Sequence, residues 1–122
     1  MRALVVDDSR AMRAIIADIL RELGFETAEA GDGEAALAAL RAAPADLVVL
    51  DYHLPGMSGA DIARAVRAEP AWNAVRVLMI TTEVDPARVR EALDAGAQEY
   101  LMKPFTADHV RDKLALLGLR AP

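Results

Sequence analysis

Residues 46–51 read Asp-Leu-Val-Val-Leu-Asp, and this stretch decides the class of fold. Its four apolar residues show no polar alternation, which is typical of a central parallel strand covered by helices on both faces. Two other stretches have a similar form, because residues 2–6 precede Asp7-Asp8 and residues 99–102 precede Lys103-Pro104. The ends of parallel strands meet at one edge of a sheet, so the sequence predicts a single site there.

Length, composition and charge restrict the class of protein. With 122 residues, the chain is long enough for one domain with its own core and too short for two. It carries a net charge of -5, so we expect a soluble acidic protein that does not bind nucleic acid directly. Cysteine is absent, and His53 and His109 lack the companions of a zinc site. The N-terminus shows neither a signal peptide nor a membrane span, which predicts the cytoplasm and no membrane partner.

Turn and capping residues divide the chain into alternating strands and helices. Ser9 and Thr106 are candidate N-caps of the first and last helices. Asp85-Pro86 has the form of an N-cap followed by proline at the first helical position, and Gly96 closes that helix. The predicted strands cover about residues 2–6, 25–30, 46–50, 75–80 and 98–102, and the middle helices cover about residues 34–41, 60–68 and 86–95.

This alternation predicts an α/β fold with a five-stranded parallel sheet and helices on both faces. The expected strand order is 2-1-3-4-5, which is flavodoxin-like and places the first and third strands side by side. Asp7, Asp8 and Asp51 then converge at the point where the strand order reverses. Converging carboxylates repel one another and call for a divalent cation, and Mg²⁺ is the usual one where phosphate is handled. Lys103 completes a predicted phosphoryl pocket.

From about Leu4 to Leu117 the chain resembles the CheY-like receiver domains of response regulators, and we interpret residues 1–122 as one such domain. The loop from Leu54 to Gly59 also resembles the family's, with Ser58 where aspartate is usual. The resemblance implies the following roles: Asp51 as phosphoacceptor, Asp7 and Asp8 as the acidic pair, Thr81 as the hydroxyl residue, Tyr100 as the switch aromatic, and Lys103 before a cis-proline at Pro104.

The same resemblance implies a site chemistry. Asp51 takes a phosphoryl group from a histidine kinase or phosphotransfer protein, or from a small donor such as acetyl phosphate, and later loses it by autodephosphorylation. Mg²⁺ is bound directly by Asp8, Asp51 and the backbone carbonyl of His53, and by Asp7 through water. Thr81 and Lys103 contact phosphoryl oxygens, and His53 and Glu83 line the path of the hydrolytic water, which tunes the lifetime.

A switch and a partner surface follow from the family pattern. Phosphorylation is expected to draw the Thr81 hydroxyl toward Asp51 and let the Tyr100 ring turn inward. An output protein would then bind the face around Arg88, Arg90, Tyr100 and Lys113. The expected function is a phosphorylation-dependent signalling switch of a two-component system, in chemotaxis or motility control, that is a phosphoacceptor and not an enzyme.

Alternatives remain open at this point. Any one of the aspartates could be a helix cap or turn former, and Tyr100 could be a half-buried aromatic with its hydroxyl in water. A Mg²⁺-dependent phosphatase of the haloacid dehalogenase type also forms an aspartyl phosphate. That type needs an Asp-x-Asp pattern and a cap domain, whereas here Asp7 and Asp8 are adjacent and no residues remain for a cap. The chain could also be the receiver portion of a larger regulator.

Overall fold

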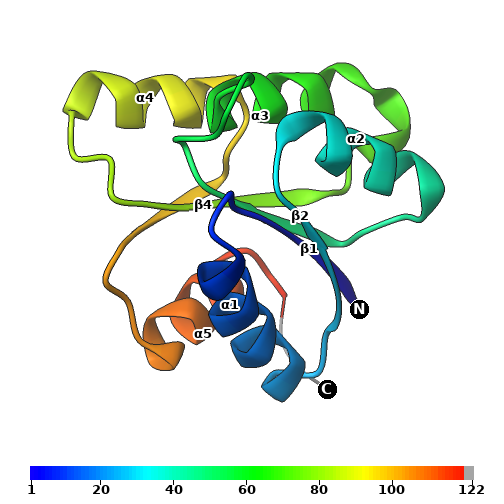
Figure 1. The fold of residues 1–122 in the computed structure, drawn as a ribbon, viewed down its shortest axis with the longest axis vertical. Coiled ribbons are helices and arrows are strands. Elements are labelled where there is room, and N and C mark those ends of the chain that lie inside the picture. Colours follow the sequence, from blue (N-terminus) through cyan, green and yellow to red (C-terminus); the bar gives the residue numbers. More distant parts are fainter. Residues whose placement is uncertain (120–122) are drawn as a thin grey trace.

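The computed structural model describes residues 1–119, and these residues form a five-stranded parallel sheet between two layers of helices (Figure 1). The last three residues of the predicted 1–122 domain lie outside the described part. The strand order β2-β1-β3-β4-β5 confirms the predicted topology. The strands are β1 (Arg2–Val6), β2 (Glu26–Ala30), β3 (Leu47–Leu50), β4 (Arg76–Thr81) and β5 (Glu99–Met102).

Helices cover both faces of the sheet. The five α-helices and one short 3₁₀ turn are α1 (Arg10–Glu22), α2 (Gly33–Ala42), α3 (Gly59–Ala68), η1 (Pro70–Trp72), α4 (Pro86–Ala95) and α5 (Ala107–Leu116). In Figure 1, α1 and α5 lie below the sheet, and α2, α3 and α4 lie above it. Within residues 1–119, no helix has the length and apolar character needed to cross a bilayer.

The two helical layers explain the uninterrupted apolar run of β3. Leu47 and Val49 belong to the core cluster shared with α1 and α5, whereas Val48 and Leu50 belong to the cluster shared with α2, α3 and α4. All four side chains are buried. Alternate side chains of a strand point to opposite faces, so a strand with a core on each side carries apolar residues at every position.

The structure confirms the predicted helices, and their bounds agree to within about one residue. Ser9, Asp85 and Thr106 each accept a hydrogen bond from the backbone in the first turn of their helices. The helix predicted at about residues 60–68 is α3, which begins at Gly59 with Ser58 as its N-cap. The Ser58 hydroxyl accepts from the Asp61 N–H, and the Asp61 carboxylate accepts from the Ser58 N–H. Serine therefore caps this helix as the usual aspartate would.

The short turn η1 was not predicted, and Arg67 joins it to its surroundings. The Arg67 guanidinium donates to the backbone carbonyls of Trp72, Asn73, Val75 and Gly96, and also to the side chain of Gln98. Gly96 ends α4 with φ +128°, and a Cβ there would collide with the Arg67 side chain. Arg67 thus fastens the end of α3 to the start of β4 and to the loop between α4 and β5.

Candidate functional site

Three polar residues are buried as deeply as the core at the carboxyl ends of adjacent strands. Asp7 is 2% exposed, Asp51 is 7% exposed and Thr81 is 0% exposed, and they follow β1, follow β3 and end β4. The pairing of Val6 with Leu50 brings Asp7 and Asp51 to the same level of the sheet. Burial of unpaired charge is unfavourable, so these carboxylates require compensation from their surroundings.

Lys103 supplies that compensation. Its Nζ lies 2.8 Å from Asp7 Oδ2 and 2.8 Å from Asp51 Oδ2. Burial opposes the charge of Lys103, but the hydrogen bonds with Asp51 and Asp7 outweigh it and raise the pKa of the ammonium group. The Lys103–Pro104 peptide bond is cis, as predicted. The structure thus brings together the ends of β1, β3 and β5.

The second oxygen of each buried carboxylate is held by the backbone. Asp7 Oδ1 accepts from the Ser9 N–H at 2.9 Å, and Asp51 Oδ1 accepts from the His53 N–H at 3.1 Å. Arg13, which was not among the predicted site residues, donates to the Asp7 carbonyl at 2.7 Å. These bonds fix the orientation of both carboxylates before any ligand binds.

Asp8 departs from the predicted convergence. Its side chain is exposed, and within residues 1–119 no three acidic or histidine side chains are gathered closely enough to hold an ion by themselves. The available donors nevertheless suit Mg²⁺ chemically, because all of them are oxygens. Among the described residues, neither the Asp8 carboxylate nor the His53 carbonyl accepts a hydrogen bond. A sparse oxygen set fits an ion that retains several waters.

Tyr100 lies against the protein instead of in solvent. Its hydroxyl donates to the Glu83 carbonyl at 2.6 Å, so the interpretation that leaves this hydroxyl in water is wrong. Burial is the main cause that raises the pKa of Tyr100 to about 12. The Glu83 N–H in turn donates to Thr81 Oγ1 at 3.2 Å. Glu83 therefore connects the two predicted switch residues through its backbone.

The two predicted lifetime residues lie close together. His53 Nε2 is 3.4 Å from Glu83 Oε1, and Arg88 Nε is 3.5 Å from the same oxygen. On the predicted output face, Arg88 and Arg90 are exposed on α4, and Lys113 pairs with Glu99 at 2.8 Å. Two of the charged groups on this face, those of Arg88 and Lys113, thus already contact carboxylates of the protein.

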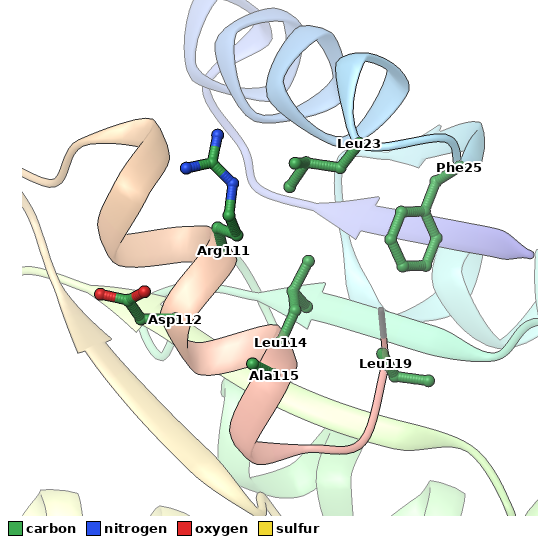
Figure 2. Close-up of a pocket in the computed structure, with 7 residues that line it drawn as sticks. All are labelled: Leu23, Phe25, Arg111, Asp112, Leu114, Ala115 and Leu119. Carbon is green, nitrogen blue, oxygen red and sulfur yellow. The ribbon is translucent and has the colours of Figure 1, made fainter. Parts of the chain in front are cut away.

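The site lies at the carboxyl edge of the sheet. The structure also has an apolar hollow of about 350 Å³ between the end of α1 and α5 (Figure 2). It lies beside Phe25, just before β2 begins, so it is at the edge opposite Asp51. None of the residues that line the hollow belongs to the site. The lining residues are Leu23, Phe25, Arg111, Asp112, Leu114, Ala115 and Leu119.

Comparison with known proteins identifies the family. The profile described as "Response regulator receiver domain" matches residues 3–115. The chain belongs to this family. The receiver domain is 45% identical over 115 residues to the chemotaxis protein CheY of Pseudomonas aeruginosa, which covers 93% of each chain. It superposes on the chemotaxis protein CheY4 of Vibrio cholerae with a TM-score of 0.89 and 33% identity, covering 95% of this chain and 97% of the other.

A third similarity concerns the metal. The receiver domain of a sensor histidine kinase from Pseudomonas aeruginosa, described with a magnesium ion coordinated in its active-site cleft, matches with a TM-score of 0.86 and 25% identity, covering 96% of this chain and 97% of the other. Receiver domains bind Mg²⁺ in the active site and interact with histidine kinases and output proteins. The predicted family, fold and function in two-component signalling are therefore confirmed. The phosphatase alternative finds no support.

Proposed function

We propose that Asp51 is the phosphoacceptor of this receiver domain. The observation that carries the proposal is the Lys103 ammonium, which lies 2.8 Å from an oxygen of Asp51 and 2.8 Å from an oxygen of Asp7. Asp51 follows the central strand β3, so Asp7 lies on one side of it and Thr81 on the other. Asp51 is therefore the carboxylate with a cationic and a hydroxyl group placed to contact a phosphoryl group bound to it.

The proposed reaction is a transfer between nucleophiles. An Asp51 oxygen attacks the phosphorus of a phosphohistidine or of acetyl phosphate, while the bond from phosphorus to the imidazole nitrogen or acetate oxygen breaks. The product is an acyl phosphate, whose later hydrolysis by water regenerates the carboxylate. Lys103 and Thr81 each contact an oxygen of the transferred group and stabilise its charge. The protein itself is the acceptor, so it does not turn over a separate substrate.

The proposed Mg²⁺ site uses the oxygens at the same edge. Asp8, Asp51 and the His53 carbonyl would hold the ion directly, and Asp7 would hold it through water. The exposed Asp8 carboxylate and the unbonded His53 carbonyl support this assignment, because both have free acceptor capacity. The ion supplies charge neutralisation between the carboxylates and the incoming phosphoryl group.

The proposed output is a change in partner binding. A Thr81 hydroxyl drawn toward a phosphoryl group would withdraw from the Glu83 N–H, and Glu83 in turn holds the Tyr100 hydroxyl. The face around Arg88, Arg90, Tyr100 and Lys113 would then bind an output protein. The named relatives are chemotaxis proteins, which supports a role in chemotaxis or motility control. We place this activity in the cytoplasm, with no direct contact with nucleic acid or membrane.

Labelling by acetyl phosphate tests the acceptor. In Mg²⁺, the wild type should be labelled at one residue, and Asp51→Asn should abolish labelling because the amide is not a nucleophile. Asp112→Asn, at an exposed aspartate of α5, is the matched control and should label normally. A chelator should suppress labelling in both proteins that label. Stoichiometric labelling of Asp51→Asn at another residue, located by peptide mass spectrometry, would overturn the assignment.

A further inference from the structure

Tyr52, the residue directly after Asp51, joins the site to α4. Its side chain is 8% exposed and lies in the core cluster shared with α2, α3 and α4. Its hydroxyl donates to Glu91 Oε1 at 2.5 Å, across 39 residues of sequence. This carboxylate accepts the hydroxyl proton in a hydrogen bond and so raises the pKa of Tyr52. The bond is charge-assisted and belongs to the stronger class of hydrogen bonds.

Further contacts close a cluster around this bond. Arg88 lies on the same face of α4 as Glu91, three residues earlier, with its Cζ 6.0 Å from the centre of the Tyr52 ring. The His53 ring meets the Tyr52 ring edge-on, with 5.1 Å between the ring centres. His53 and Arg88 both approach Glu83 Oε1, and the Glu83 side chain is only 11% exposed. We refer to Tyr52, His53, Glu83, Arg88 and Glu91 as the Tyr52 cluster.

The helix reached by the cluster is held weakly by apolar packing. The buried residues of α4 are Ala92 and Ala95, both of which have small side chains and lie in its second half. Val84, just before the helix, is largely exposed. An element with few buried apolar contacts depends on its polar contacts for its position. The bonds from Tyr52 and Glu83 are therefore well placed to set the position of α4.

The cluster is also separate from the contact made by Tyr100. Tyr100 lies on β5 and bonds to the Glu83 backbone, whereas Tyr52 is covalently adjacent to Asp51 and bonds to the middle of α4. The Tyr52 backbone is also attached to the start of α3, because its carbonyl accepts from the Gly59 N–H at 2.8 Å. Because Tyr52 directly follows Asp51 in the chain, a shift of the Asp51 backbone would be passed to the Tyr52 ring.

We propose that Tyr52 is a positioning residue that couples Asp51 to α4 through Glu91 and Arg88, in parallel with the Thr81 and Tyr100 contacts. This inference rests on the proposed role of Asp51 as acceptor. It predicts that a group bound to Asp51 changes the stability of α4 by two separable routes. The partner-binding face on α4 then depends on a residue that is itself buried beneath the helix.

Amide hydrogen exchange in residues 86–95 tests the coupling. It would be measured with and without Mg²⁺ and beryllofluoride, a mimic of the phosphoryl group, in the wild type, Tyr52→Phe, Glu91→Ala and the double variant. Each single variant should speed exchange in α4 about ten- to hundredfold, the range expected for loss of one hydrogen bond to a charged group. The double variant should be no faster than the singles, because both changes remove the same bond. Tyr52→Phe should also lose at least half of the response of α4 to beryllofluoride.

Two controls isolate the effect. Asp94→Ala alters an exposed acidic residue of the same helix and should leave both exchange and the beryllofluoride response unchanged. Tyr100→Phe removes the other tyrosine hydroxyl, and its effect should add to that of Tyr52→Phe because the routes are separate. Wild-type exchange in Tyr52→Phe, or additive effects of Tyr52→Phe and Glu91→Ala, would overturn the coupling.

The outcome also distinguishes this inference from the acceptor assignment. Beryllofluoride that binds the wild type and Tyr52→Phe equally, and shifts α4 equally in both, overturns only the role of Tyr52. Beryllofluoride that binds Asp51→Asn as well as it binds the wild type overturns the acceptor assignment, and the coupling with it. Binding to Tyr52→Phe with a reduced response of α4 supports both.

Discussion

The residues at the site differ in which of their oxygen atoms already accept hydrogen bonds. Asp7 and Asp51 each have one oxygen on Lys103 and the other on a backbone N–H two residues later. Asp8 and the His53 carbonyl accept no hydrogen bond within residues 1–119. The bonded atoms orient the acceptor, and the unbonded atoms are available to an ion. One edge of the sheet thus combines preorganised groups with free ones.

The residues beside Glu83 yield a prediction about lifetime. His53 is exposed and stands 3.4 Å from Glu83 Oε1, so it covers part of the approach to Asp51. His53→Ala should let water reach an acyl phosphate more easily and speed autodephosphorylation severalfold, about 1 kcal/mol in the barrier. The variant should still be labelled by acetyl phosphate. The autodephosphorylation rate is measured as the decay of labelled protein after the donor is removed, with His109→Ala as the control. Unchanged decay in both His53→Ala and Glu83→Ala would contradict the proposed roles.

Tyr100 yields a prediction about pH. Burial raises its pKa from 10.0 to about 12, so the folded protein favours the neutral ring. Between these values the unfolded chain loses this proton while the folded chain keeps it, and the stability that the group contributes falls as pH rises. The loss is roughly 2 kcal/mol by about pH 12. Tyr100→Phe should lack it, so wild-type and variant unfolding free energies, measured in urea, should converge or cross as pH rises above 10. Parallel pH profiles would contradict this prediction.

Among the elements, α3 depends on Arg67 for its connection to the rest of the fold. Its guanidinium donates to four backbone carbonyls in two separate loops, and its side chain lies against Gly96. Arg67→Met keeps the apolar stem and removes the donors, so it should lower the free energy of unfolding by about 2–3 kcal/mol. Arg64→Met, in an exposed pair with Asp61 on the same helix, should cost at most about 0.5 kcal/mol. Equal urea midpoints for the two variants would refute this role of Arg67.

The contact between β4 and β5 carries the switch prediction. Hydrogen bonds link Thr81 and Tyr100 through the Glu83 backbone: Thr81 Oγ1 lies 3.2 Å from its nitrogen, and the Tyr100 hydroxyl lies 2.6 Å from its carbonyl oxygen. Thr81→Ala and Tyr100→Ala should therefore leave labelling of Asp51 measurable and reduce the effect of beryllofluoride on partner affinity. The measurement is the ratio of affinities with and without beryllofluoride, for the partner that the immobilised wild type retains. A wild-type ratio in both variants would show that these residues do not transmit the signal.

At the scale of the whole molecule, local sequence patterns predicted most of the fold. The apolar runs before Asp7 and Asp51, the caps at Ser9 and Asp85, and the glycine at the end of α4 are short-range signals, and each is confirmed. The right-handed crossovers of parallel strands indicated helices on both faces, and the strand order was predicted as that of a flavodoxin-like sheet. The same logic placed Asp7, Asp51, Thr81 and Lys103 at one edge.

Contacts between distant residues could not be predicted in this way. Nothing in the sequence near Tyr52 indicates a bond to Glu91, and nothing near Arg67 indicates its carbonyl partners, because these depend on how α3 and α4 pack. The exposed position of Asp8 was missed for a related reason. Adjacent side chains at the end of a strand point in different directions, so only Asp7 joined the buried group.

The position of η1 also determines what tryptophan fluorescence can measure in this protein. Trp72 is the single tryptophan of the chain and lies in η1, partly buried against the core cluster and joined to Arg67 through its carbonyl. That turn precedes β4, whereas Asp51 and Lys103 lie at the opposite ends of the strands. We therefore expect indole emission to follow unfolding and the attachment of α3, and not to respond to ions or phosphoryl mimics at Asp51. A spectroscopic sensor of the site requires a tryptophan placed elsewhere, and position 52 is already aromatic, buried and next to the acceptor.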